Sequence, residues 1–178
     1  MGIGNTAQGN NALPSDNPDE VFDLINDNDQ VIGQVRRGDA HQNPALLHRS
    51  VQVLVFDDMG RVLLQRRSHT KDLFPGYYCA SASGHVTSGE AYDETAAREM
   101  EEELGLSLPL TYRAKLLIRS AYETEMTAIY LARSNGPFVF NPHETDGGQF
   151  FSLADIEAGR RTGELAMTPA LLAALDTL

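Results

Sequence analysis

Residues 98–105 place an unusually dense set of acidic side chains on one predicted helix. Glu99, Glu101, Glu102 and Glu103 fall within five positions, and Arg98 is the cation beside them. Like charges at helical spacing each destabilise a helix by about a few tenths of a kcal/mol, and a solvated face usually intersperses lysines. A merely acidic surface is one interpretation of this pattern. The interpretation we favour is a site for a hard divalent cation, because carboxylate oxygens suit Mg²⁺ or Mn²⁺.

The predicted helix runs from about Tyr92 to Leu104. Thr87 and Glu90 have the spacing of a capping box before its N-terminal end. Gly105 follows the last helical residue and provides a left-handed stop. The sequence therefore predicts where this helix begins and where it ends.

The two faces of this helix differ in polarity. Apolar residues three and four positions apart predict a buried stripe, formed by Ala97, Met100 and Leu104. The carboxylates at spacing i, i+3 and i+4 share the opposite face, and these are Glu99, Glu102 and Glu103. The preceding loop contains Gly84 and Gly89, which let backbone carbonyls and amides approach a metal ion and phosphates closely.

Strand and helix patterns alternate irregularly along the rest of the chain. The predicted strands are 21–25, 31–35, 51–56, 62–65, 112–120, 126–132 and 149–152, and the later helices are 153–160 and 169–178. This mixture predicts a single α/β domain over residues 19–178, an α/β/α sandwich with a mixed sheet. Residues 1–18 are rich in Gly and Asn and carry one charged side chain, so we expect a flexible tail there.

Charge and composition exclude several function classes. The formal net charge of −11 repels nucleic-acid backbones and anionic membrane surfaces, so neither a nucleic-acid duplex nor a membrane is an expected partner. The apolar runs are too short for a transmembrane helix, and no secretory signal is visible. Cys79 is the single cysteine, which fits a reducing compartment, and we expect a cytoplasmic protein. The oligomeric state stays open between a monomer and a homodimer.

The glycine loop and the acidic helix together follow the spacing G-x5-E-x7-R-E-U-x-E-E-x-G-U, where U is aliphatic. The positions that satisfy it are Gly84, Glu90, Arg98, Glu99, Met100, Glu102, Glu103, Gly105 and Leu106. This pattern resembles the Nudix box, and all nine constrained positions are filled. The resemblance implies a Nudix fold and a hydrolase that cleaves diphosphate linkages in small molecules.

The resemblance also implies roles for individual residues. Glu99, Glu102 and Glu103, with Gly84 beside them, would hold Mg²⁺ or Mn²⁺. Arg98 would orient a glutamate, and Glu90 would support the loop. Metal ions polarise phosphoryl oxygens and lower the pKa of an attacking water, so positioning and charge neutralisation would carry catalysis.

Residues outside the box resemble a narrower relative, isopentenyl-diphosphate isomerase. The similarity implies a second metal site made of His41, His48, His85, Glu123 and Glu125. It also implies phosphate contacts from Arg37, Arg66, Arg67 and Lys71. Imidazole and carboxylate groups can share one divalent ion.

Two departures separate the chain from the isomerase. Ser83 stands where the isomerase has its catalytic cysteine, and a hydroxyl is a far weaker acid than a thiol. Isomerases also tend to have an incomplete Nudix box, whereas the box of this chain is intact. Cys79 is expected to point elsewhere. Glu144 lies in the loop before the last strand, where some relatives have a supporting or basic carboxylate, and an exposed loop carboxylate is the favoured interpretation.

The sequence therefore predicts a Mg²⁺- or Mn²⁺-dependent hydrolase acting on a small-molecule diphosphate, such as a nucleoside di- or triphosphate or a derivative. An isomerase of isopentenyl diphosphate is the first alternative. A nucleotide-binding sensor without catalysis is the second, although binding alone does not require so many convergent carboxylates.

Overall fold

A seven-stranded mixed sheet forms the centre of the computed structural model, which describes residues 17–71 and 73–178. The strands are β3 (His48–Phe56), β4 (Val62–Arg67), β5 (Tyr78–Cys79), β6 (Ala82–His85), β7 (Thr111–Arg119), β8 (Thr124–Arg133) and β9 (Thr145–Phe151). β3 pairs in parallel with β8, and the other pairs are antiparallel. The sheet is mixed, as the sequence predicted.

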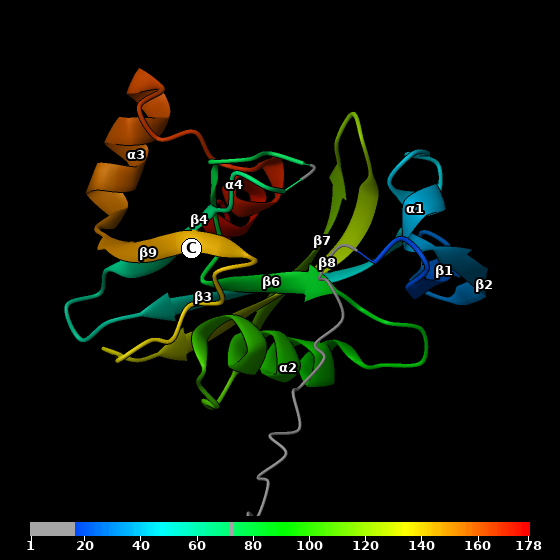
Figure 1. The fold of residues 1–178 in the computed structure, drawn as a ribbon, viewed down its shortest axis with the longest axis horizontal. Helices are drawn as coiled ribbons and strands as arrows, with labels where there is room; N and C mark the ends of the chain where they lie inside the picture. Colours follow the sequence, from blue (N-terminus) through cyan, green and yellow to red (C-terminus); the bar gives the residue numbers. More distant parts are fainter. Residues whose placement is uncertain (1–16, 72) are drawn as a thin grey trace, which may run out of the picture.

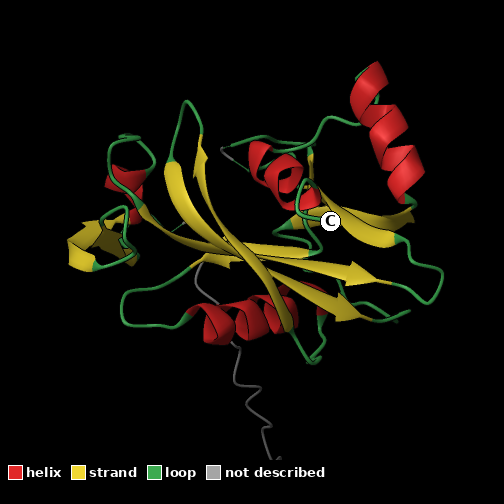
Figure 2. Ribbon diagram, turned by 180° about the vertical axis from the view of Figure 1, so that it is seen from behind, coloured by secondary structure: helices red, strands yellow, loops and turns green. Residues whose placement is uncertain are grey.

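Helices cover both faces of this sheet, which gives the predicted α/β/α layers (Figure 1). α2 (Tyr92–Leu104) lies on one face, and α3 (Leu153–Thr162) and α4 (Pro169–Leu175) lie on the other. The reverse view shows the same layers (Figure 2). Alternate residues of β3 feed the two cores, since successive strand side chains point to opposite faces. Val51, Val53 and Val55 pack with the α2 side, and Leu54 packs with the α4 side.

A two-stranded hairpin stands beside the sheet, with α1 (Arg37–Ala40) following it (Figure 1). Its strands are β1 (Val21–Ile25) and β2 (Val31–Arg36). Phe22 is fully buried, whereas most of β2 is exposed. β1 therefore supplies an inward-facing ring next to the sheet edge, which becomes part of the site described below.

On one side of β3 the strands of the central sheet separate, because β3 has two different partners there. The N-terminal half of β3 pairs with β6, but β3 pairs with β4 only at Phe56 and Val62. β4 continues instead with β5 and β9. A cavity of about 1410 Å³ lies here, lined by residues of β3, β6 and the end of β4.

The boundaries of α2 agree with the sequence, but two details of the helix were wrong. The N-cap is Ala91, whose N–H donates to the Glu94 carboxylate, so the Thr87–Glu90 pair does not cap the helix. Ala97 is exposed and Ala96 is buried instead. The buried face is therefore turned by one residue, and this rotation brings Glu103 inward beside Met100 and Leu104. Gly105 ends the helix in the left-handed region, at φ 66°, as expected.

The short elements β5, β6 and α1 were not predicted as strands or helix. The predicted tail, residues 1–18, lies outside the described residues except for Asn17 and Pro18. The carbonyls of these two residues accept hydrogen bonds from the N–H groups of Glu20 and Gly38, respectively. Among the described residues, no helix has the length and apolar character needed to cross a membrane.

Candidate active site and metal-binding clusters

Arg98 joins carboxylates of the second half of α2 to Glu90 in the loop that precedes the helix. Its guanidinium donates to both oxygens of Glu90, each at 3.0 Å. It also donates to Glu99 at 2.7 Å and to Glu102 at 3.3 Å. Partial burial alone would raise the pKa of Glu90, but the hydrogen bonds from Arg98 hold that pKa below its usual range. Glu90 is therefore a charged anchor for the arginine.

Glu103 and Glu99 point from α2 toward the opening in the sheet. Glu103 is 6 % exposed, and it accepts hydrogen bonds from the Ser83 N–H at 3.1 Å and from Gln65 Nε2 at 2.7 Å. Glu99 passes directly over Gly84, and a Cβ at residue 84 would overlap its carboxylate. The glycine is required here because of this close approach.

The carboxylates of Glu99 and Glu103 lack sufficient compensating charge in the protein itself. Burial, with a smaller contribution from the Glu102 charge, raises the pKa of Glu99 to about 7 against the opposing effect of Arg98. Burial and the nearby Glu99 raise the pKa of Glu103 well above its usual range. A bound cation would favour the ionised forms of both groups. The donor set therefore fits a hard divalent cation, with Glu102 on the exposed side of the same cavity.

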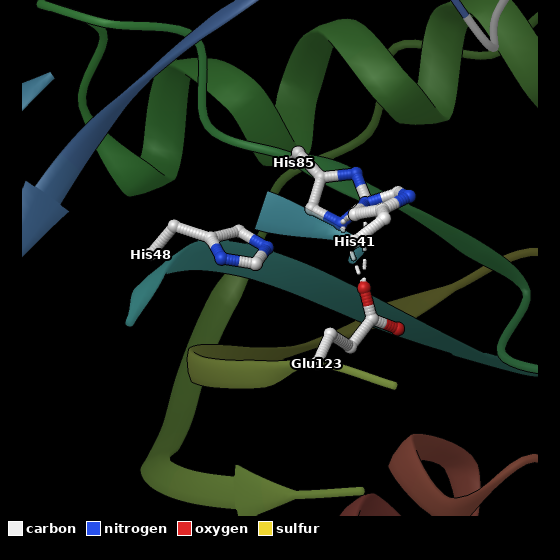
Figure 3. Close-up of side chains that lie close together, drawn as sticks. All are labelled: His41, His48, His85 and Glu123. Carbon is white, nitrogen blue, oxygen red and sulfur yellow. Dashed lines mark hydrogen bonds and ion pairs between the residues drawn. The ribbon is translucent and has the colours of Figure 1, made fainter. Parts of the chain in front are cut away.

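A second cluster gathers residues from four separate segments (Figure 3). One ligand atom from each of His41, His48, His85 and Glu123 lies within 4.8 Å of the others. His41 Nε2 lies 3.3 Å from Glu123 Oε2 and 3.4 Å from His85 Nε2. Glu125 Oε1 lies 3.3 Å from His85 Nε2, so all five residues predicted for a second metal site are close together.

His48 is fully buried, and its two ring nitrogens differ. Nδ1 donates to the Leu46 carbonyl at 3.0 Å, while Nε2 has no hydrogen-bond partner within the described part of the chain. The carbonyl fixes the proton on Nδ1, which leaves a lone pair on Nε2 toward the cluster. Burial, followed by the charge of His85, lowers the pKa of His48, which favours the neutral form that binds metals.

Within the same cluster, His85 and Glu125 form a charged pair. Burial alone would lower the pKa of His85, but hydrogen bonds to Glu123 and Glu125 raise it to about 9. Burial alone would raise the pKa of Glu125, but His85 lowers it to about 2. Phe22 of β1 stacks on both His48 and His85, with ring centroids 5.1 and 4.8 Å away. The hairpin thus fixes two of the imidazole planes.

Three of the four cations predicted to contact phosphate line the cavity: Arg37, Arg67 and Lys71. Arg37 NH1 lies 3.0 Å from His85 Nδ1, between the hairpin and the histidine cluster. Arg66 is not among the cavity residues; it is exposed and donates to the Gly76 carbonyl at 3.2 Å. The alternation of β4 turns Arg66 away while Gln65 and Arg67 face inward, so the position of Arg66 does not support the predicted phosphate contact.

Glu144 is a cavity residue that the sequence reading treated as exposed. It forms an ion pair with Lys71 at 2.6 Å, and both side chains are largely buried. A local signal was the polar Asn141–Glu144 loop before β9, but nothing nearby in the sequence indicated the lysine partner.

Ser83 and Cys79 both line the cavity. The Cys79 thiol donates to the Gln65 carbonyl at 3.7 Å, and burial raises its pKa to about 12. The thiol is therefore protonated and weakly nucleophilic at neutral pH. Its side chain belongs to the same cavity, although the sequence suggested that it points elsewhere.

Known proteins share the sequence and fold of this chain. The NUDIX domain family model matches residues 46–171. An uncharacterized Nudix hydrolase of Streptomyces coelicolor is 40 % identical over 166 residues, covering 90 % of this chain and 88 % of the relative. A Nudix hydrolase of Deinococcus radiodurans is 35 % identical over 159 residues, covering 83 % and 91 % of the two chains.

Solved structures agree with the sequence relatives. The crystal structure of DR0079 from Deinococcus radiodurans superposes with a TM-score of 0.77 at 29 % identity, covering 87 % of this chain and 97 % of that one. The NUDIX domain of Shewanella oneidensis NrtR, solved with ADP ribose, shares the fold with a TM-score of 0.59 at 18 % identity, covering 74 % and 84 %. With its intact box folded around the acidic cluster, this chain belongs to the Nudix hydrolase family.

Proposed function

We propose that the protein is a Mg²⁺- or Mn²⁺-dependent hydrolase that cleaves a diphosphate linkage in a small molecule, such as a nucleoside di- or triphosphate or a derivative. The observation that carries the proposal is the pair of carboxylates of Glu103, which is buried, and Glu99, which is largely buried, gathered beside Gly84 at a large cavity. Paired carboxylates with raised pKa values are costly to keep in a folded protein unless a cation is bound there.

Glu99, Glu102, Glu103 and the backbone at Gly84 would hold the metal. A divalent ion at this place supplies charge neutralisation for phosphoryl oxygens and lowers the pKa of water. The protein's own contribution is positioning: Arg98 orients Glu99, Glu90 anchors Arg98, and the Ser83 N–H with Gln65 fixes Glu103.

The cavity cations provide the second part of substrate binding. Arg37, Arg67 and Lys71 carry donors suited to phosphoryl oxygens, and they line the same cavity as the acidic cluster. Lys71 is paired with Glu144, so a bound phosphate would compete with that carboxylate for the ammonium group. This competition favours ligands with more than one phosphoryl group.

The histidine cluster is proposed as a second divalent-metal site. The cluster offers nitrogen ligands from three imidazoles and oxygen ligands from Glu123 and Glu125. Nε2 of His48 has no partner in the described residues, which supports metal coordination by this atom. Four of the five residues, all except His48, line the same cavity, so an ion held there would lie beside the same substrate.

The histidine cluster is also the observation that favours an isomerase of isopentenyl diphosphate. Two features of the cavity oppose that alternative. Ser83 offers no thiol, and the neighbouring lining residues Ser50 and Gln52 are polar, whereas alkene protonation needs an apolar pocket with a strong acid and base. A small-molecule ligand in the cytoplasm remains the expected context, and a non-catalytic sensor is the remaining alternative.

A substrate panel in ¹⁸O-labelled water tests these alternatives together. It includes nucleoside di- and triphosphates, ADP ribose and isopentenyl diphosphate, each with Mg²⁺ and with Mn²⁺. Mass spectrometry identifies the labelled product and hence the phosphorus attacked. Binding without turnover would support the sensor, formation of dimethylallyl diphosphate would support the isomerase, and inactivity without binding would reject the proposal.

A further inference from the structure

Gln52 is a buried polar residue on the wall of the cavity, and the mechanism above does not use it. It is 4 % exposed and lines the cavity. Its Oε1 is buried without a hydrogen-bond partner in the described segments. A buried amide oxygen in this state lacks the bonds that nearly all such groups make in folded proteins.

The strand register places Gln52 between the two candidate metal clusters. His48, Ser50 and Gln52 share one face of β3, because side chains two residues apart point the same way. His48 belongs to the histidine cluster at one end. Gln52 lies opposite Ser83 of β6, whose N–H binds Glu103, at the other end. A substrate whose diphosphate binds at one cluster would extend its organic part alongside this row.

Two polar side chains near Gln52 make hydrogen bonds inside the protein. The Ser50 and Thr127 hydroxyls share a hydrogen bond of 2.8 Å. Gln65 donates through Nε2 to Glu103 and to the Ser81 carbonyl. Its Oε1 also has no partner in the described segments, but Gln65 is not among the residues that line the cavity, whereas Gln52 is. Leaving a buried acceptor unpaired destabilises the folded protein. An apolar residue of similar size would be cheaper at position 52 if the residue served only packing.

We propose that Gln52 is a specificity-determining residue whose Oε1 accepts a hydrogen bond from a hydroxyl or amino group on the organic part of the diphosphate substrate. Phosphoryl oxygens are acceptors and cannot pair with Oε1, so the donor must come from the group attached to the diphosphate. A site with a buried acceptor rejects analogues that lack the matching donor. This inference rests on the hydrolase function proposed above and narrows its substrates to those with such a donor.

Gln52→Met tests the inference, because methionine keeps the length of the side chain and removes the acceptor. The assay uses the nucleoside diphosphate that the wild type hydrolyses fastest in the panel. We expect KM to rise about tenfold with kcat largely retained, the effect of losing about one hydrogen bond to the ligand. The melting temperature of the ligand-free variant should stay equal or rise, because an unpaired buried acceptor has been removed.

Methylenediphosphonate serves as a second probe, since it carries phosphoryl groups but no organic donor. Its inhibition constant should be unchanged in Gln52→Met. Gln149→Met is the matched control: Gln149 is exposed on β9, outside the cavity, and the same substitution should leave KM, the inhibition constant and stability unchanged.

Four results would overturn the inference. An unchanged KM would show that the substrate does not contact Oε1. A parallel rise in the inhibition constant of methylenediphosphonate would show that Gln52 contacts the phosphates instead. A lower melting temperature together with a lower kcat would indicate a packing role. Wild-type inactivity across the panel would reject the hydrolase function itself, and this inference with it.

Discussion

The backbone of Gly84 and the carboxylate of Glu99 share a space that a single additional carbon atom would fill. An ideal Cβ at residue 84 overlaps the Glu99 oxygens, and Glu99 is held from the other side by Arg98 at 2.7 Å. The carboxylate therefore has no room to retreat without breaking this ion pair. The contact makes Gly84 a geometric requirement of the acidic cluster.

Gly84→Ala should accordingly displace Glu99 and reduce kcat by about a hundredfold, the scale expected when a catalytic group moves by about 1 Å. Steady-state kinetics and metal titration check this expectation. Gly33→Ala is the control, because a Cβ there meets only ordinary contact with Leu24 at 3.8 Å. Wild-type turnover in Gly84→Ala would contradict the assignment of Glu99 to the site.

Glu102→Gln should remove most hydrolysis while the fold remains intact. The amide keeps the shape of the side chain and removes one negative charge from the proposed metal site, so we expect kcat to fall by about two or more decades. Relief of repulsion between like charges would leave apo stability equal or slightly higher. Glu101→Gln on the same helix, exposed and outside the cavity, should behave as the wild type in the same assay. Equal activity of the two variants would reject the acidic cluster as the catalytic metal site.

In the metal-free protein, the ion pair of His85 and Glu125 should stabilise the fold by an amount that depends on pH. Burial alone would lower the pKa of His85, but pairing raises it from 6.5 to about 9, so this stabilisation is complete below 6.5 and lost as the pH rises through 9. Burial alone would raise the pKa of Glu125, but pairing lowers it from 4.5 to about 2, so its stabilisation is complete above 4.5 and lost as the pH falls through 2.

The difference in melting temperature between the wild type and Glu125→Gln, both stripped with EDTA, should therefore be largest between pH 4.5 and 6.5. It should shrink toward pH 9 and above. Calorimetry across this range checks the prediction. A difference that is constant with pH would mean that Glu125 acts through packing, without ionic pairing to His85.

The wild type should not isomerise isopentenyl diphosphate, and Ser83→Cys should give at most a trace. A thiol at position 83 would supply one acid beside His85, but the cavity walls nearby would still include polar side chains such as Ser50 and Gln52. The measurement is dimethylallyl diphosphate formed by each purified protein with Mg²⁺. Wild-type turnover on the order of 1 s⁻¹ would make the isomerase the preferred function.

Local patterns predicted the elements whose residues are close in sequence. The periodicity of residues 92–104 and the glycine at 105 defined α2, and strand alternation located most strands of the sheet. The phase of α2 was wrong because Ala96 and Ala97 are equally apolar, and only packing against the sheet distinguishes them. β6 escaped prediction since its four residues become a strand through pairing with β3, about 30 residues earlier in the chain.

The sequence predicted which residues form the site better than it predicted how buried they are and which groups they contact. The sequence identified the acidic cluster and all members of the histidine cluster. It could not show that Glu103 is buried, because the groups that satisfy its carboxylate, Gln65 and Ser83, lie 38 and 20 residues away. Glu144 and Gln52 were missed for the same reason. Their environments depend on tertiary contacts, such as the ion pair of Glu144 with Lys71.

The parallel pairing of β3 with β8 joins positions 77 residues apart, as in the contact of Ser50 with Thr127. His48 begins one of these strands, and Glu125 lies near the start of the other. Closing so long a loop is slow and entropically costly, so both strands come together only as the chain completes its folding. Partly folded chains would consequently lack the histidine cluster. A metal ion bound at the histidine cluster would therefore stabilise only the native state. The more fully the site is occupied, the lower the population of partly unfolded forms.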